Sequence, residues 1–177
     1  MERNKKQLLP MILVFTIIGA AYSCRMLAML DIGGVWMSYT RAALYLLLFS
    51  LWGYSLDRRI IQTQALHCLR LTAALMLVWL ILRTLKYEFV TDLTVARYIW
   101  YLYYLPMLFI PLLGVYVALS LGKSEEYRLT EKAGFLAAIP GILFLLVITN
   151  DLHQQVFAFD SGVPGVPDNY GYSHGIF

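Results

Sequence analysis

The sequence predicts an all-α membrane protein, a polytopic bundle of about five transmembrane helices. Of its 177 residues, 60% are hydrophobic and 14% are charged, and the mean hydropathy is +0.65. Soluble domains average about 45–50% apolar and about 25% charged residues, so the composition excludes that class. The apolar residues also gather in long stretches with short polar connections, which leave no room for a separate soluble domain.

Five apolar stretches are candidate spans: residues 8–24, 35–56, 65–82, 98–122 and 133–149. Each approaches the roughly 20 residues that a helix needs to cross the hydrocarbon core. The second contains Arg41, and the third has the shortest uncharged run because Arg70 lies near its start. The fourth contains Pro106 and Pro111, and each proline removes one backbone hydrogen bond and predicts a kink. The membrane domain is therefore placed at residues 1–149.

The first stretch has a second interpretation. A basic start, an apolar run and the sequence Ala21-Tyr22-Ser23-Cys24 together resemble a secretory signal with its cleavage site, and faintly a lipoprotein site at Cys24. We favour an uncleaved first helix. Cleavage would leave four spans and the same topology for the rest of the chain.

Residues 150–177 differ in composition from the spans. Their turn-forming residues include Gly162, Pro164, Gly165, Pro167, Gly171 and Gly175. Such residues break helical periodicity. An irregular loop is therefore predicted to follow the fifth span.

Lysine and arginine residues in short loops mark the cytoplasmic side of a membrane protein. The N-terminus and the loops after the second and fourth spans hold nine of the fourteen: Arg3, Lys5, Lys6, Arg58, Arg59, Arg70, Lys123, Arg128 and Lys132. The other side holds five: Arg25, Arg41, Arg83, Lys86 and Arg97. We therefore predict a multi-pass plasma-membrane protein with a cytoplasmic N-terminus and an extracellular segment 150–177.

Aromatic residues cluster at the predicted outer end of the fourth span: Tyr98, Trp100, Tyr101, Tyr103 and Tyr104. Tyr and Trp favour the membrane interface because the ring lies among acyl chains while its polar edge stays hydrated. We favour such an interfacial belt over the alternative, a stacking platform for a sugar or a nucleobase.

Charged residues on the outer side are the candidates for ligand contact, because a charge within a bilayer costs about 2.5 kcal/mol or more. Arg41 lies ~9 Å inside the outer end of its span, within reach of the surface by snorkelling. It is either an interfacial anchor, which we favour, or the partner of a ligand, of Asp31 or of Asp151. Arg97 and the other outer charges form either a salt-bridged lid, the lining of a shallow pocket, or solvated loop ends.

The most distinctive polar patch, residues 149–157, directly follows the fifth span and contains Asn150, Asp151 and His153. Asp151 and His153 alone are a weak metal signal, because zinc sites use three or four ligands. No metal and no cofactor is predicted. The default role of His153 is a hydrogen bond that ties the loop to a neighbouring helix end.

Catalytic motifs are missing from the sequence. It has no Ser-His-Asp set in a suitable context, no H-E-x-x-H, no phosphate-binding G-x-x-x-x-G-K-[ST] loop and no Cys/His metal spacing. The inner basic loops are expected to contact anionic lipids, and nothing indicates nucleic-acid recognition. The expected partners are the lipid bilayer, an unidentified extracellular or intramembrane ligand, and a second copy of the chain in a homodimer.

Two separated motifs carry a family resemblance. They are Arg97-Tyr98 followed by Leu105-Pro106, and Thr149-Asn150-x-Leu152-His153 at the end of the fifth span. Over about residues 35–157 the chain resembles the N-terminal seven-helix membrane region of bacterial sensor histidine kinases. In that family a T-N-x-L-H segment lies on the outer face, where the charge pattern independently places it here. The chain departs from the family in its extra first helix and in Gln154, where a second histidine is common.

The resemblance implies the signal-input region of a two-component system. The residues that would form or stabilise its outer sensing face are Arg41, Arg97, Asn150, Asp151 and His153. It also implies that segment 150–177 leads to a sixth helix, with further helices and an effector beyond. These 177 residues hold neither a phospho-accepting histidine in a cytoplasmic helix pair nor an ATP-binding module, so we do not expect this chain to be an enzyme.

The alternative is a small transporter or channel subunit. Such a protein needs polar residues near the middle of the membrane. Apart from Arg41, the central thirds of the spans offer only Gly19, Ser50, Thr72 and Gly114. An intramembrane enzyme is disfavoured because no acid, base and nucleophile share one depth. We therefore predict a sensor region.

Overall fold

The computed structural model describes residues 2–30, 32–56, 60–124, 127–128, 131–159 and 172–174. Long helices dominate it. They are α1 (Glu2–Met29), α2 (Gly34–Leu56), α3 (Thr63–Thr84), η1 (Leu85–Phe89), α4 (Leu93–Leu102), α5 (Tyr104–Ser120), α6 (Glu131–Gly134), η2 (Phe135–Ala137), α7 (Ala138–Ile148) and α8 (Asn150–His153). Two short strands follow, β1 (Phe157–Phe159) and β2 (Tyr172–His174).

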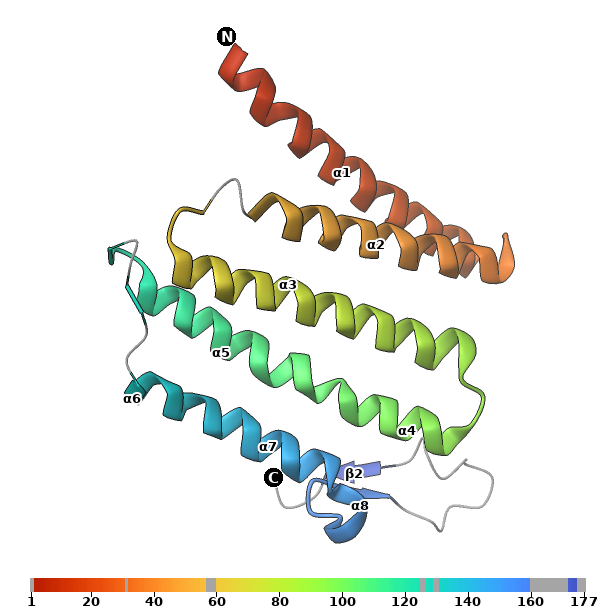
Figure 1. Ribbon diagram of the computed structural model, residues 1–177. Helices are drawn as coiled ribbons and strands as arrows, with labels where there is room; N and C mark the ends of the chain where they lie inside the picture. The colour runs from red at the N-terminus through yellow and green to blue at the C-terminus, as the bar shows by residue number, and fades with distance from the viewer. Residues whose placement is uncertain are drawn as a thin grey trace.

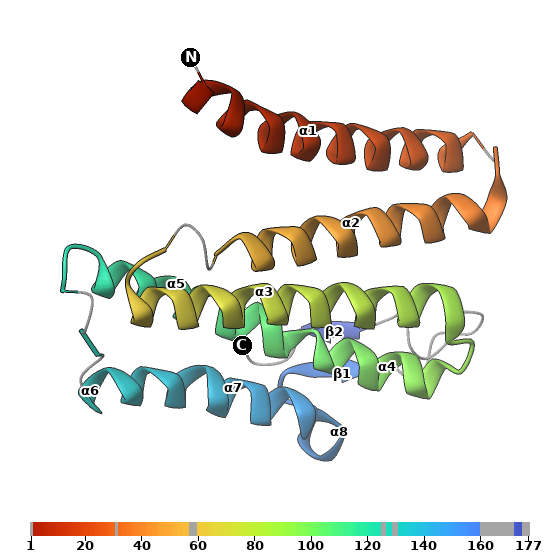
Figure 2. The same ribbon diagram turned by 45° about the horizontal axis from the view of Figure 1, so that its top comes forward.

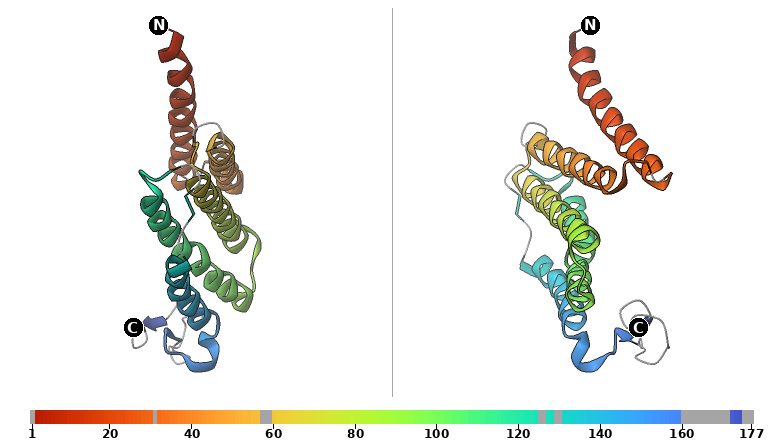
Figure 3. Two further views of the ribbon diagram at one scale, coloured as in Figure 1. Left: turned by 60° about the vertical axis from the view of Figure 1, so that its left-hand side comes forward. Right: turned by 90° about the vertical axis from the view of Figure 1, so that its right-hand side faces the viewer.

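The long helices lie side by side in a row that follows the chain (Figure 1). α2 packs between α1 and α3, α3 packs on α5, and α5 packs on α7. The order is the same after rotation (Figure 2), and the side views show α1 diverging from the row toward its N-terminus (Figure 3). Because successive helices alternate in direction, the start of α2, the end of α3, the start of α4 and α8 all lie at one end of the row.

Two glycines make the reversal between α1 and α2. Gly33 has φ +84° and Gly34 has φ +52°, a left-handed conformation that glycine adopts without steric cost. α2 therefore begins at Gly34 and carries Arg41 two turns into the helix, on the side that faces α3. Asp31, one partner left open for Arg41, lies outside the described residues.

The fourth predicted span is helical over residues 93–120, with one irregular position at Tyr103. α4 ends at Leu102, Tyr103 forms a turn, and α5 begins at Tyr104. The physical reason lies three residues further on, because Pro106 has no N–H to donate to the carbonyl of Leu102. Pro111, by contrast, lies within α5. Pro106 thus accounts for the local irregularity between α4 and α5.

The fifth predicted span is also built from short pieces. α6, the 3-10 turn η2 and α7 follow one another without a gap and end at Ile148. Pro140 lies in the first turn of α7, where its missing N–H has no intrahelical partner to lose. The tighter turn η2 directly before it accommodates the ring, and α7 then runs to the polar segment at residue 149.

Few side chains are buried and many large apolar ones are exposed on every long helix. A soluble protein rarely exposes apolar patches of this extent, whereas lipid covers them at no cost. Three helical stretches are long and apolar enough to cross a membrane, namely Pro10–Met29, Thr63–Phe89 and Thr94–Ser120, and Phe135–Ile148 is a shorter apolar helix. The described residues therefore form a helical membrane protein.

Within segment 150–177, the described residues 150–159 and 172–174 include short regular elements. α8 follows α7 after a break at Thr149, and β1 pairs with β2 in an antiparallel sheet that aligns Phe157 with His174. The side chain of Asn150, described below, holds the start of β1 in place. Residues 160–171 and 175–177, which hold the predicted glycines and prolines, lie outside the described residues, as do Arg58 and Arg59.

Candidate functional site

Asn150 is the best-buried polar residue at the end of the row, with no exposed surface. Its Oδ1 accepts hydrogen bonds from the backbone N–H groups of Val156 (3.1 Å) and Phe157 (2.9 Å). Its Nδ2 donates to the carbonyl of Phe157 at 2.8 Å and to Tyr101 Oη at 3.4 Å. The side-chain amide thus acts as a peptide group would, holding the start of β1 against α8.

The turn between Asn150 and Val156 is closed by local contacts. Gln154 adopts φ +48°, and its N–H donates to the carbonyl of Asn150 at 2.7 Å. His153 Nδ1 accepts from the N–H of Gln155 at 3.0 Å, and its Nε2 lies 3.3 Å from Thr149 Oγ1. Because Nδ1 accepts here, the proton is assigned to Nε2. The hydrogen bonds of His153 therefore lie among residues 149–155, and one of them reaches Thr149, the C-cap residue of α7.

Asp151 connects this turn to α4. Its Oδ1 accepts from Tyr101 Oη at 2.7 Å, and its Oδ2 lies 3.3 Å from an amino nitrogen of Arg97. Arg97 and Tyr101 are four residues apart and so lie on one face of α4. Asp151 is therefore the ion-pair partner of Arg97 and not of Arg41. We call Arg97, Tyr101, Asn150 and Asp151 the polar node.

The two contacts of Asp151 differ in expected strength. The side chains of Arg97 and Asp151 are 25% and 26% exposed, and such solvated pairs contribute less than about 1 kcal/mol. Tyr101 has no exposed surface, and hydrogen bonds to a charged group contribute about 1.5–3 kcal/mol. The phenol–carboxylate bond is thus the stronger link between α8 and α4.

An aromatic cluster lies directly beneath the polar node. Phe157 is 4% exposed, and its ring centroid lies 4.7 Å from that of Trp100 and 5.6 Å from that of Tyr104. Tyr101 and Val147 complete this core. The Tyr98–Tyr104 run was interpreted as an interfacial belt, but Tyr101 is a core residue that also binds Asp151, while Tyr98 remains 48% exposed.

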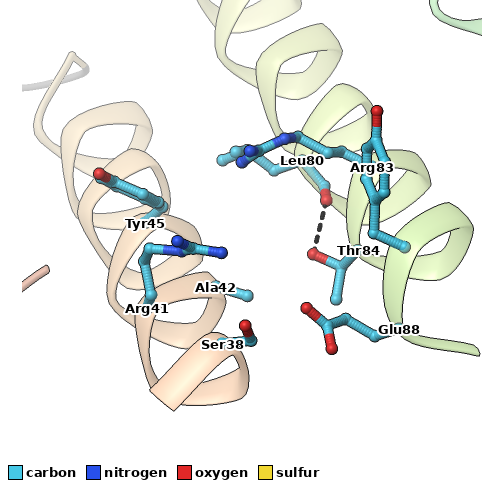
Figure 4. A pocket seen from close by; sticks show the side chains of 9 residues that line it. Ser38, Arg41, Ala42, Tyr45, Leu80, Arg83, Thr84 and Glu88 are labelled. Atoms are coloured by element: carbon cyan, nitrogen blue, oxygen red, sulfur yellow. Dashed lines mark hydrogen bonds between the residues drawn. The ribbon is translucent and has the colours of Figure 1, made fainter. Parts of the chain in front are cut away.

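Arg41 lies apart from the polar node, in a hollow between α2 and α3. Arg41 from α2 and Arg83 from α3 both extend into this space (Figure 4). A hollow of about 240 Å³ is lined by these two residues together with Tyr45 and Glu88. A second hollow of about 610 Å³ shares Arg41 and Arg83 and extends to Arg25 of α1. The structure therefore divides the predicted sensing residues between two places.

Sequence reasoning named Arg97, Asn150 and Asp151, which the structure brings together, and His153, which lies beside them. It missed Tyr101 as a member of the node, although its spacing of four from Arg97 was a usable signal. No local signal marks Phe157 as the core residue of the turn. Among the residues that the structure describes, no group of three or more His, Cys, Asp or Glu side chains is placed to hold a metal ion.

A double-mutant cycle tests the link between α8 and α4. Tyr101→Phe should lower the free energy of unfolding by about 1.5–3 kcal/mol, because the carboxylate of Asp151 loses a charge-assisted hydrogen bond. Asp151→Ala should remove the same interaction, so the double variant should lose clearly less than the sum of the single losses. Chemical unfolding in detergent, followed by tryptophan fluorescence, measures all four proteins. Additive losses would show that the two side chains do not interact.

Comparison with known protein families shows to which family the chain belongs. The family model of the N-terminal 7TM region of histidine kinase matches residues 40–177. The chain belongs to this family. The match includes the whole polar node and the described strands, and it begins within α2. No curated protein and no solved structure matches the chain.

Membership of the histidine kinase 7TM family gives the chain a function class. This region is the sensor of the kinase and not its catalytic domain, so the chain is a membrane-embedded signal-input region. The apolar helices described above agree with that location. The T-N-x-L-H segment is the family feature noted in the sequence. In the structure it forms the turn that contributes Asn150 and Asp151 to the polar node.

Proposed function

We propose that the polar node is the outward-facing point at which this signal-input region reads its stimulus. The observation that carries the proposal is the pair of bonds from Asp151 to Arg97 and Tyr101. They join the segment after α7 to α4, two parts of the chain that are about fifty residues apart. A stimulus that shifts this segment thereby acts directly on α4.

The irregular position at Tyr103 gives the signal a path toward the other end of the row. α4 is ten residues long and meets α5 at Tyr103, and bending is easiest there because Pro106 leaves one backbone hydrogen bond unmade. Movement of α4 alters its junction with α5, and α5 packs on both α3 and α7. Hinges of this kind commonly lie at the ends of helical elements. We propose α4 as the moving part of the sensor.

We also propose that the chain crosses the membrane five times, with its N-terminus in the cytoplasm. α2 is 23 residues long, which suffices for a span, and its Arg41 lies ~10 Å inside the helix end, within reach of the interface. Lys and Arg are more numerous on the side that holds the N-terminus. This orientation places α8 and the polar node outside, where an external stimulus arrives.

Cysteine labelling tests the topology. The two native cysteines are first removed by Cys24→Ala and Cys68→Ala. A single cysteine is then introduced at an exposed position, either by Gln155→Cys at one end of the row or by Ser124→Cys at the other. A membrane-impermeant maleimide applied to intact cells should label position 155 directly and position 124 only after permeabilisation. The reverse pattern would contradict the orientation, and labelling of both before permeabilisation would contradict the number of spans.

A chromosomal variant tests the sensing role. Asp151→Asn in the host's own gene should alter the transcripts that change when the gene is deleted, because α8 loses its ion pair with Arg97 and keeps only a weaker, neutral hydrogen bond from Tyr101. Gln155→Ala is the matched control, since it changes an exposed side chain in the same segment outside the polar node, and it should leave these transcripts nearly unchanged. Membrane levels of each variant are compared by immunoblot. If Asp151→Asn accumulates normally and every transcript is unchanged, the node has no sensing role.

A further inference from the structure

The hollow between α2 and α3 brings positively charged side chains together within the row of helices. Arg41 lies seven residues after the start of α2, and Arg83 lies six residues before Phe89, where η1 ends. Both guanidinium groups therefore lie ~10 Å inside the helix ends. Within the described part of the chain, neither side chain makes a hydrogen bond or an ion pair. Two facing cations in an apolar layer repel each other and favour an anion between them.

The other polar groups around the hollow are mostly hydrogen-bond donors. Trp79 Nε1 is buried and has no hydrogen-bond partner, although buried polar groups nearly always have one. Arg25 of α1 adds a third positive charge to the larger hollow. Glu88 is the one acidic side chain among the described residues that line the two hollows, so the net charge of the lining is +2. This set of groups suits a ligand that accepts hydrogen bonds and carries negative charge.

The inner wall of the larger hollow is apolar. Phe49 lies eight residues beyond Arg41, and Met76 lies seven residues before Arg83. Both positions lie ~10 Å further along their helices from the end of the row that the arginines are near. The volume of about 610 Å³ lies within the usual range of roughly 300–1,000 Å³ for small-molecule sites. The hollow is therefore cationic at its outer end and apolar at its inner end.

We propose that this hollow binds an amphiphilic anion, with its acidic head group held by Arg41 and Arg83 and its apolar body against Phe49, Met76 and Trp79. The head group is a carboxylate or a phosphate, because arginine binds both with paired hydrogen bonds. Its source is either an anionic lipid of the surrounding leaflet or a diffusible amphiphile. The site is built by α1, α2 and α3, so it does not depend on the proposed role of the polar node.

Fluorescence quenching of Trp79 tests the site directly. The full chain is placed in phosphatidylcholine nanodiscs with Trp36, Trp52 and Trp100 changed to Phe, so that Trp79 is the only fluorophore of its kind. A terminally brominated octanoate should quench it saturably, because the bromine is carried into the hollow. The matching brominated octanol partitions into lipid more readily but lacks the charge, so it should quench without saturation. Equal saturable quenching by the alcohol would overturn the proposal.

Arginine variants identify the head-group contacts. Arg41→Gln and Arg83→Gln should each raise the half-saturating concentration about tenfold, or about 1.4 kcal/mol, and the double variant should lose saturable quenching. Arg70→Gln is the matched control, because Arg70 lies seven residues from the other end of α3 and lines neither hollow. It should bind as the parent does. Retained saturation in the double variant, or an equal loss in Arg70→Gln, would overturn the assignment.

Competition in the parent protein needs no arginine variant. Octanoate and octyl phosphate should displace the brominated probe, whereas octanol and inorganic phosphate should not. Displacement by inorganic phosphate alone would show a simple anion site and contradict the apolar half of the proposal. Adding phosphatidylglycerol to the nanodiscs separates the two sources. Competition by phosphatidylglycerol supports a lipid occupant, and unchanged probe binding supports a diffusible anion.

Discussion

Asn150→Ala should release the turn that joins α8 to β1. The change removes the acceptor of two backbone N–H groups and the donor to the Phe157 carbonyl, all in a position without solvent access. Buried polar groups left without partners cost about 1–3 kcal/mol each, so we expect a local loss of about 3 kcal/mol or more. Hydrogen–deuterium exchange of the peptide that contains Val156 and Phe157 should accelerate roughly a hundredfold.

Two further variants sharpen this prediction. Asn150→Asp keeps the acceptor oxygen but loses the donor, so its exchange rate should lie between those of the parent and the alanine variant. Gln155→Ala changes an exposed side chain in the same turn and should have almost no effect. Exchange that is unchanged in Asn150→Ala would show that the backbone of residues 150–157 holds its shape without this side chain.

Phe157→Ala should undock β1 from α4. The ring is 4% exposed and packs on Trp100 and Tyr104, and replacing a buried aromatic residue by alanine costs about 3–5 kcal/mol. Trp100 reports the loss, because water replaces the ring beside it and its emission should shift to longer wavelength. The measurement uses a protein in which the other three tryptophans are phenylalanine.

A phenylalanine elsewhere in the chain provides the control. Phe135 lies in η2 and is 78% exposed, so Phe135→Ala removes the same atoms without opening a core. The unfolding free energy of this variant should stay within about 0.5 kcal/mol of the parent value. The emission wavelength of its Trp100 should stay close to that of the parent. Equal losses for the two variants would mean that Phe157 does not anchor the segment.

The two largest expected effects are at Asn150 and Phe157, and the sequence alone points to the first of these residues but not to the second. Asn150 lies in a recognisable motif, but the sequence does not distinguish its role from the roles of Asp151 and His153. The structure separates the three: Asn150 shapes the turn, Asp151 reaches α4, and the hydrogen bonds of His153 lie among residues 149–155. Their difference depends on which side chain faces α4, and that is decided by the break at Thr149.

Local composition by itself determined the helical membrane class and the family. Both follow from properties that adjacent residues carry, namely the length of apolar runs and the order of a short polar motif. A helix in lipid satisfies its own backbone hydrogen bonds, so its existence can be inferred without knowing what it packs against. For the same reason, Pro106 predicted a disturbance of the fourth span, although not that the turn would lie at Tyr103.

Only the tertiary structure decided which charges meet. The sequence left Asp151 as a partner of Arg41, whereas the structure pairs it with Arg97 and places Arg41 opposite Arg83. Such pairings depend on how each helix is rotated about its axis and on which helices lie beside it. The sequences of apolar helices with similar composition determine neither of these. The hollow between α2 and α3 arises in the same way, because its two arginines are forty-two positions apart and meet only where the helices pack.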